Sequence, residues 1–272
     1  MSREQNAQPF AMVPLPAERS QKPRTTGLTM MMDWGLAHGR AEDYLELLEP
    51  YVDLVKIVVG TARLYPESYL ISKLEFYKQN MVIPFLGGQF SEYVFATQGW
   101  SGMEPFFQEA KRLGFDALEI SDNCVPLNDE ERARMIKMAI GCGLEVHGEV
   151  GSKVFSQSAA DLISQANVCM DAGAEIVLVE AAELIVDGEP NQTIIKELRD
   201  GLDLTKVLFE LTGPWIKGVT LSSIHELKRF LLTEFGPDVN LANVMPDDVL
   251  ETEASRVGLS VVGPDREHGA AV

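Results

Sequence analysis

The chain has 272 residues, 46% hydrophobic and 24% charged, a composition ordinary for a soluble globular protein. This length suits one α/β barrel of about 250 residues or two smaller domains. The formal net charge of −18 argues against nucleic-acid and membrane-surface partners. The sequence contains no run of about 18 apolar residues, so we expect no transmembrane helix.

The N-terminal stretch, residues 1–26, contains charges and prolines but lacks the apolar segment of a signal peptide. We expect it to form an N-terminal arm, either flexible or packed against the rest of the chain. The three cysteines, Cys124, Cys142 and Cys169, include no CxxC pair and are odd in number. Free thiols in a reducing compartment are therefore expected, which favours a cytoplasmic protein.

From residue 27 onward, short apolar runs alternate with amphipathic, helix-like segments. The apolar runs, each expected to be a strand, are 28–33, 53–60, 81–88, 116–122, 144–151, 174–181, 206–211 and 238–244. They are apolar throughout, as parallel strands covered on both faces are. The segments between them carry helix signals, such as the acidic first turn of 128–143 and the C-terminal Gly173.

This alternation predicts the fold class. Eight strand–helix units predict an α/β protein with a single parallel eight-stranded (β/α)8 barrel over residues 27–262, followed by a C-terminal tail, 263–272. A doubly wound open sheet is the main alternative. Neither GxGxxG nor GxxxxGK[ST] occurs, so nothing supports a nucleotide-binding fold.

Polar residues lie at the C-terminal ends of the expected strands. They are Asp33, Lys56, Thr61, Gln89, Glu119, Asp122, Glu149, Glu180, Glu210, Asn240 and Asn243. In a barrel these ends converge on the face that carries catalytic groups. Carboxylates gathered in one mouth repel each other unless a cation or raised pKa values relieve them.

Carboxylate oxygens suit Mg²⁺ or Mn²⁺ better than zinc. We therefore expect two or three of Asp33, Glu119, Glu149, Glu180 and Glu210 to bind a hard divalent ion. Asp33, Glu119, Glu180 and Glu210 are the candidate metal ligands, and Glu149 is the candidate for a catalytic role. The alternative is that all of them form structural ion pairs and backbone caps.

Lys56 interrupts an apolar strand, and a buried lysine is costly unless it is paired or used in chemistry. A structural ion pair, an anion anchor, a general acid or base and a Schiff-base amine all remain open. His147 lies two residues before Glu149, on the same side of the strand, and is either a core residue or catalytic. The segment GEVGSK, 148–153, offers backbone N–H groups and Lys153 for an anion, and Lys153 joins Lys56, Glu149 and His147 as a candidate catalytic residue.

Several segments, in this order, resemble the phosphosulfolactate synthases. They are LTMMMDWG, DLVKIVVGTA, the Gly-Gly turn after the third strand, RLGFDALEISD, GEVGSK, DAGAEIVLVE, KVLFEL and FGPDVNLANV. The resemblance covers about residues 27–260 and is most specific in LGFDALEISD, DAGAEIVLVE and FGPDVNLANV. Related plant heat-stress-associated proteins share this fold.

The resemblance implies a (β/α)8 barrel that adds sulfite to phosphoenolpyruvate with Mg²⁺, an early step of coenzyme M synthesis. In that chemistry an enolate-like carboxylate is stabilised while the nucleophile adds to C3 and a proton arrives at C2. The positions that match the family's polar strand ends are Asp33, Lys56, Glu119, Glu149, Lys153, Glu180 and Glu210.

The sequence departs from the family where the family carries cations. Trp34 stands in place of a lysine, Ala181 or Ala182 in place of an arginine, and Ser260 in place of another arginine. This makes the mouth less cationic and more apolar, although Arg63 and Lys217 could compensate. The residues expected to bind substrate are Trp34, Arg63, Gln89, Asn240 and Asn243.

We therefore expect a phosphosulfolactate synthase-like lyase that adds sulfite, or a similar nucleophile, to phosphoenolpyruvate or a related small carboxylate. Its partner is a small-molecule substrate, and a homo-oligomer is compatible with the sequence. The alternatives are a divergent barrel enzyme acting on a less anionic substrate and a non-catalytic stress-associated protein. Retention of the strand-end carboxylates together with Lys56 argues against the last of these.

Overall fold

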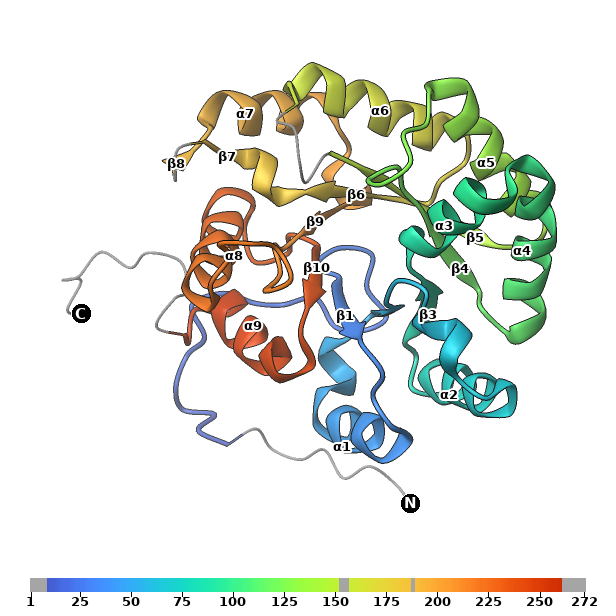
Figure 1. Ribbon diagram of the computed structural model, residues 1–272. Coiled ribbons are helices and arrows are strands. Elements are labelled where there is room, and N and C mark those ends of the chain that lie inside the picture. Colours follow the sequence, from blue (N-terminus) through green and yellow to red (C-terminus); the bar gives the residue numbers. More distant parts are fainter. Residues whose placement is uncertain (1–8, 152–156, 187–188, 261–272) are drawn as a thin grey trace.

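Eight parallel strands close into a barrel surrounded by helices in the computed structural model, which describes residues 9–151, 157–186 and 189–260 (Figure 1). The strands, in barrel order, are β1 (Thr29–Asp33), β2 (Leu54–Ile57), β3 (Ile83–Leu86), β4 (Ala117–Ile120), β5 (Glu145–Val150), β6 (Ile176–Glu180), β9 (Val207–Glu210) and β10 (Leu241–Val244). Pairing of β10 with β1 closes the ring. The predicted (β/α)8 barrel is confirmed.

Helices cover the outside of the barrel. They are α1 (His38–Leu48), α2 (Glu67–Gln79), α3 (Gly88–Gln98), α4 (Trp100–Leu113), α5 (Asp129–Gly141), α6 (Ala159–Asp171), α7 (Gln192–Gly201), α8 (Leu221–Phe235) and α9 (Val249–Arg256). Between β3 and β4 the chain forms two helices, separated at Gly99, which has a φ of 61°. The first of them, α3, was not expected from the sequence. A two-stranded sheet, β7 (Ile185–Val186) with β8 (Glu189–Pro190), lies between β6 and α7.

Side chains of the strands alternate between the inside of the barrel and the helix layer, as the period of two requires. The inner cluster is Leu28, Met30, Leu54, Phe85, Ala117, Ile176, Leu178, Leu208 and Ala242. Two residues further along the strands, the same inward alternation places Lys56, Glu119, Glu180 and Glu210. The barrel is therefore apolar through its middle and charged at the C-terminal ends of its strands.

The opposite, N-terminal end of the barrel is covered by basic residues of the N-terminal arm. The guanidinium of Arg19 lies 3.0 Å from the carboxylate of Glu253. Lys22 donates to the carbonyl oxygens of Glu49 and Asn80 at 3.0 and 3.1 Å. Because these arm side chains are almost fully buried, this part of the arm packs on the barrel.

None of the helices in the described part of the chain has the length and apolar character needed to cross a membrane.

Candidate active site

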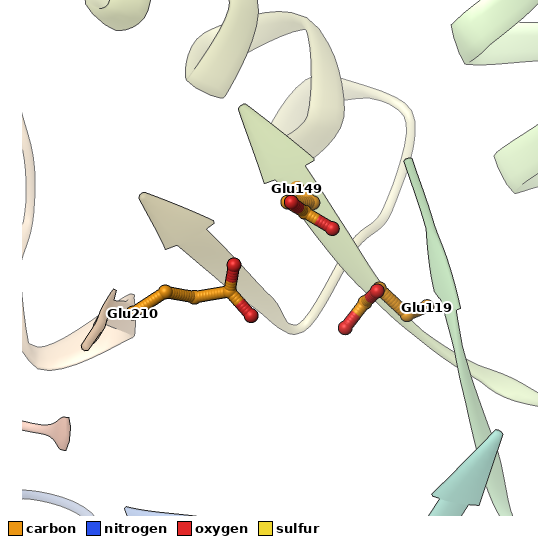
Figure 2. A group of neighbouring side chains, drawn as sticks. All are labelled: Glu119, Glu149 and Glu210. Carbon is orange, nitrogen blue, oxygen red and sulfur yellow. The ribbon is translucent and has the colours of Figure 1, made fainter. Parts of the chain in front are cut away.

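Three glutamates form an acidic group at the mouth of the barrel. Glu119 on β4, Glu149 on β5 and Glu210 on β9 each offer a carboxylate oxygen, and these oxygens lie within 4.8 Å of one another. Figure 2 shows the three side chains converging from their separate strands on a common space. All three are buried, with at most 3% of each residue exposed. The strand alternation therefore brings together acids that are up to 91 positions apart in the sequence.

Lys56 on β2 is a cationic partner of this acidic group. Its Nζ lies 2.6 Å from Oε2 of Glu119 and 2.8 Å from Oε1 of Glu210. Burial lowers the pKa of Lys56, but the charges of Glu119, Glu210 and Glu149 outweigh burial and raise it above its usual value. The side chain is therefore an ammonium at neutral pH. An ammonium has no lone pair, so this environment favours an electrostatic role over Schiff-base formation.

The acidic group also receives hydrogen bonds from neutral donors. The backbone N–H of Gly88, at the start of α3, donates to Oε1 of Glu119 at 2.9 Å. A Cβ at Gly88 would lie only 2.8 Å from that oxygen, so glycine permits this close approach. The side-chain amide of Asn123 donates to Oε1 of Glu149 at 2.6 Å. These donors satisfy carboxylate oxygens that are buried away from water.

The arrangement of oxygens fits a divalent metal ion. Two ligands of one Mg²⁺ lie at most about 4.2 Å apart, which is twice the metal–oxygen distance. The acidic group, with its oxygens within 4.8 Å, requires only a small closure to satisfy this limit. Among the described residues the ammonium of Lys56 lies beside these buried carboxylates, and a divalent ion bound there would add positive charge. Glu119, Glu149 and Glu210 could therefore hold a metal.

Glu180 belongs to the same end of the barrel. It is 1% exposed and pairs in register with Glu210, so its side chain also points into the barrel. It is not part of the acidic group defined by the mutual oxygen distances.

Asp33 was expected among the metal ligands, but the structure does not bring it to the acidic group. Its Oδ2 accepts from Tyr77 at 2.7 Å and lies 2.7 Å from Nζ of Lys73 on α2. Its Oδ1 accepts from the backbone N–H groups of Gly35 and Leu36. Asp33 therefore faces the helix layer, where it fixes the loop after β1.

His147 and Asn240 lie toward the N-terminal end of the barrel. Nε2 of His147 is 3.1 Å from Oε1 of Glu145, and its ring packs edge-on against Phe85. The side-chain oxygen of Asn240 accepts from the N–H of Leu28, and its amide donates to backbone carbonyl groups, including that of Val207. These contacts tie neighbouring strands together. None of these contacts reaches the acidic group, and the expected roles of His147 in catalysis and Asn240 in substrate binding stay predictions.

The remaining residues expected to bind substrate lie at the rim or outside it. Trp34, 44% exposed, contacts Trp215 with ring centroids 5.5 Å apart. Gln89 and Arg63 are exposed. Asn243 is buried, has a φ of 61°, and its amide donates to the carbonyl oxygen of Leu211, directly after Glu210. Lys153 lies outside the described residues, so its predicted catalytic role stays a prediction.

Two residues near the acidic group were missed from the sequence. Glu92 on α3 is buried and binds the loop between β4 and α5. Arg132 on α5 donates to the backbone oxygen of Glu149 at 3.1 Å and pairs with Asp122 at 2.6 Å. For Glu92 the available signal was a carboxylate inside the largely apolar stretch 90–96.

Comparisons with known proteins agree with this architecture. Residues 17–261 match the family model of (2R)-phospho-3-sulfolactate synthase. The phosphosulfolactate synthase of Methanothermobacter thermautotrophicus is 32% identical over 252 residues, which cover 89% of this chain and 92% of the relative. The enzyme of the same name from Bacillus subtilis is 27% identical over 89% of this chain and 93% of the relative. The protein HEAT-STRESS-ASSOCIATED 32 of Arabidopsis thaliana is 23% identical over 82% of this chain and 84% of the relative.

Among solved structures, a 3-hexulose-6-phosphate synthase superposes with a TM-score of 0.50 at 14% identity, covering 87% of this chain and 99% of that one. The carboxyl transferase domain of Rhizobium etli pyruvate carboxylase, with pyruvate and biocytin, gives 0.55 at 12% identity over 84% of this chain and 41% of that one. At these identities the likeness establishes the barrel fold alone.

Proposed function

Because the chain belongs to the (2R)-phospho-3-sulfolactate synthase family, we propose that it is a lyase-type enzyme that adds sulfite, or a similar nucleophile, to phosphoenolpyruvate or a related small carboxylate. The observation that carries this proposal is the ion-paired Lys56 inside the acidic group, at the end of the barrel where active sites lie. Buried charges are costly, and a site of this kind is more readily explained by chemistry than by stability.

The metal of the proposed site is Mg²⁺ or Mn²⁺, held by Glu119, Glu149 and Glu210. When bound, such an ion supplies positive charge that stabilises an enolate-like carboxylate. Lys56 adds a second positive charge at the same place and orients the substrate carboxylate. Its burial also excludes water from the charged centre, which strengthens both interactions.

The proton that reaches C2 of the substrate requires a positioned acid or base. The raised pKa of Lys56 makes its ammonium a weak proton donor. Lys56 pairs directly with Glu119 and Glu210. Glu149 accepts from the amide of Asn123 at 2.6 Å, and it is the carboxylate to which we assign the proton transfer, in keeping with the catalytic role expected from its strand-end position.

A sulfite-dependent assay tests the proposed reaction. The chelator-treated protein is incubated with phosphoenolpyruvate, sulfite and Mg²⁺, and the addition product is identified by mass spectrometry. We expect product with the parent chain, none after omission of the metal, and at least a hundredfold slower formation with Glu149→Gln. An exposed carboxylate changed in the same way, Glu104→Gln, is the matched control. A parent chain that binds Mg²⁺ but forms no product would refute the proposed substrate pair.

A second candidate function, addition to a less anionic substrate, is favoured by the surroundings of the mouth. The exposed pair Trp34 and Trp215 gives the rim an aromatic surface. Lys56, Lys73 and Arg132, buried cations that the structure describes at this end, are each already paired with a carboxylate. An unphosphorylated unsaturated acid such as cinnamate replaces phosphoenolpyruvate in the same assay. Product from cinnamate alone would favour this second function, and inactivity with both acids would favour a non-catalytic protein.

A further inference from the structure

The buried carboxylate of Glu92 holds the loop between β4 and α5. Its Oε1 accepts from the hydroxyl of Ser121, and its Oε2 accepts from the backbone N–H groups of Cys124 and Val125 at 2.5 and 2.9 Å. Glu92 is only 3% exposed, although it sits on a helix that has solvent on its other side. A carboxylate is costly to bury, and these three donors offset much of that cost.

The loop held by Glu92 carries a contact to the acidic group. Its anchor points, Ser121 on one side and Cys124 and Val125 on the other, bracket Asn123 in the sequence. Asn123 in turn donates its amide N–H to Oε1 of Glu149 at 2.6 Å. Glu92 on α3 and Glu149 are therefore connected through hydrogen bonds at both ends of this loop and the loop backbone between them.

The neighbouring residue of the loop adds a second link. Asp122 accepts from Arg132 at 2.6 Å, and Arg132 also donates to the backbone oxygen of Glu149 at 3.1 Å. The side chain and the main chain of Glu149 are thus both held by groups whose positions depend on this loop. If the loop moved, the orientation of Glu149 relative to Glu119 and Glu210 would change with it.

We infer that Glu92 is a positioning residue for the metal-binding carboxylates: it fixes the β4–α5 loop so that Asn123 aims Glu149 at Glu119 and Glu210. This inference rests on the proposed function, because it takes the acidic group to be the metal site. Partners that orient metal ligands typically contribute about 10- to 100-fold in metal affinity. Glu92 itself touches neither the metal nor the substrate.

Manganese binding to the full chain tests the inference without any catalytic assay. Chelator-treated protein is titrated with Mn²⁺ by calorimetry, and thermal unfolding of each variant is recorded alongside. The variants are Glu92→Gln, Asn123→Ala, the double variant, and Glu104→Gln as a surface control for the same carboxylate-to-amide exchange. Gln at position 92 keeps the size of the side chain but loses the charge that receives the backbone N–H groups.

We expect Glu92→Gln and Asn123→Ala each to weaken Mn²⁺ binding by about tenfold or more. The Mn²⁺ affinity of the double variant should be no lower than that of the single variant with the lower affinity. This lack of additivity would show that the two residues act through one path. Wild-type affinity in a folded Glu92→Gln protein, or fully additive losses, would overturn the inference. Should Glu92→Gln fail to fold, unchanged affinity in Asn123→Ala would overturn it equally. No Mn²⁺ binding by the parent chain would refute the metal site itself, which is a separate result.

Discussion

Replacement of Lys56 by methionine is the sharpest test of the charged centre, because it removes the ammonium and keeps the length of the side chain. It leaves Glu119 and Glu210 buried beside each other without their cation. Breaking a buried ion pair costs about 3–5 kcal/mol. We therefore expect the free energy of unfolding of Lys56→Met to fall by about this amount when a chelator is present.

Metal should reverse much of this loss. The proposed metal site would share the carboxylates of Glu119 and Glu210 with Lys56, so the ammonium would weaken binding of the divalent ion. A ligand at a hundred times its Kd stabilises a folded protein by about 2.7 kcal/mol. At one fixed Mg²⁺ concentration, the gain in stability should be larger for Lys56→Met than for the parent chain, since the variant binds the ion more tightly.

Urea denaturation with and without Mg²⁺ measures both quantities. Lys78 is the matched control, because it forms a comparable 2.9 Å pair with Asp116 on the surface. Exposed pairs contribute about 0–1 kcal/mol, so Lys78→Met should change stability little and should not alter the response to Mg²⁺. An equal Mg²⁺ effect on Lys56→Met and the parent chain, or a loss below about 1 kcal/mol in chelator, would refute the reasoning.

Three further predictions concern single sites. Gly88→Ala should lower the free energy of unfolding, measured by urea denaturation, by about 1–3 kcal/mol, because the added Cβ would lie 2.8 Å or less from two side chains. At Gly141 an added Cβ would have no atom within 4 Å, so Gly141→Ala should be nearly neutral. Burial raises the pKa of Cys169 to about 11, so a thiol reagent should modify it only after unfolding, whereas exposed Cys124 should react in the native protein; equal rates would contradict this. The hydrogen bond with His147 lowers the pKa of Glu145. The stability that this pair adds is therefore fully present above the ordinary glutamate pKa of about 4.3, and it is lost as the pH falls through the lowered pKa. Glu145→Gln should therefore flatten the acid limb of the stability curve measured by denaturation between about pH 3 and 6.

The barrel could be predicted from the sequence because its signal is repeated and local. Each strand is a short apolar run, and each is followed by a helical pattern with its own start and end residues. The inward carboxylates Glu119, Glu149 and Glu210 could be found for a related reason, since a charged residue at the end of an apolar strand stands out. The mutual approach of these acids then follows from barrel closure.

Other parts of the site could not be predicted, and the reasons differ. The face of Asp33 is hidden because β1 reads TMMMD, and a strand that is apolar on both faces gives no alternation to follow. Asn240 was expected at the C-terminal end of its strand because the expected strand began at residue 238. In the structure β10 begins at Leu241, so Asn240 lies just before the strand, at the N-terminal end of the barrel. The contacts of Glu92 join α3 to a loop about 30 residues later, and sequence periodicity carries no information on such long-range side-chain bonds.

The balance of charge at the mouth sets the order in which ligands can bind. Four carboxylates face into this end of the barrel, those of Glu119, Glu149, Glu180 and Glu210. Among the described inward-facing strand residues, Lys56 is the cation that pairs with them, through Glu119 and Glu210. A substrate carboxylate entering this centre first would be repelled by these buried carboxylates, and repulsion is strong in a medium of low dielectric. A divalent ion entering first would reverse that field, and the same carboxylates would then attract an acid through the metal and Lys56. Metal binding should therefore precede substrate binding, and a carboxylate substrate should show little affinity for the chelator-treated protein.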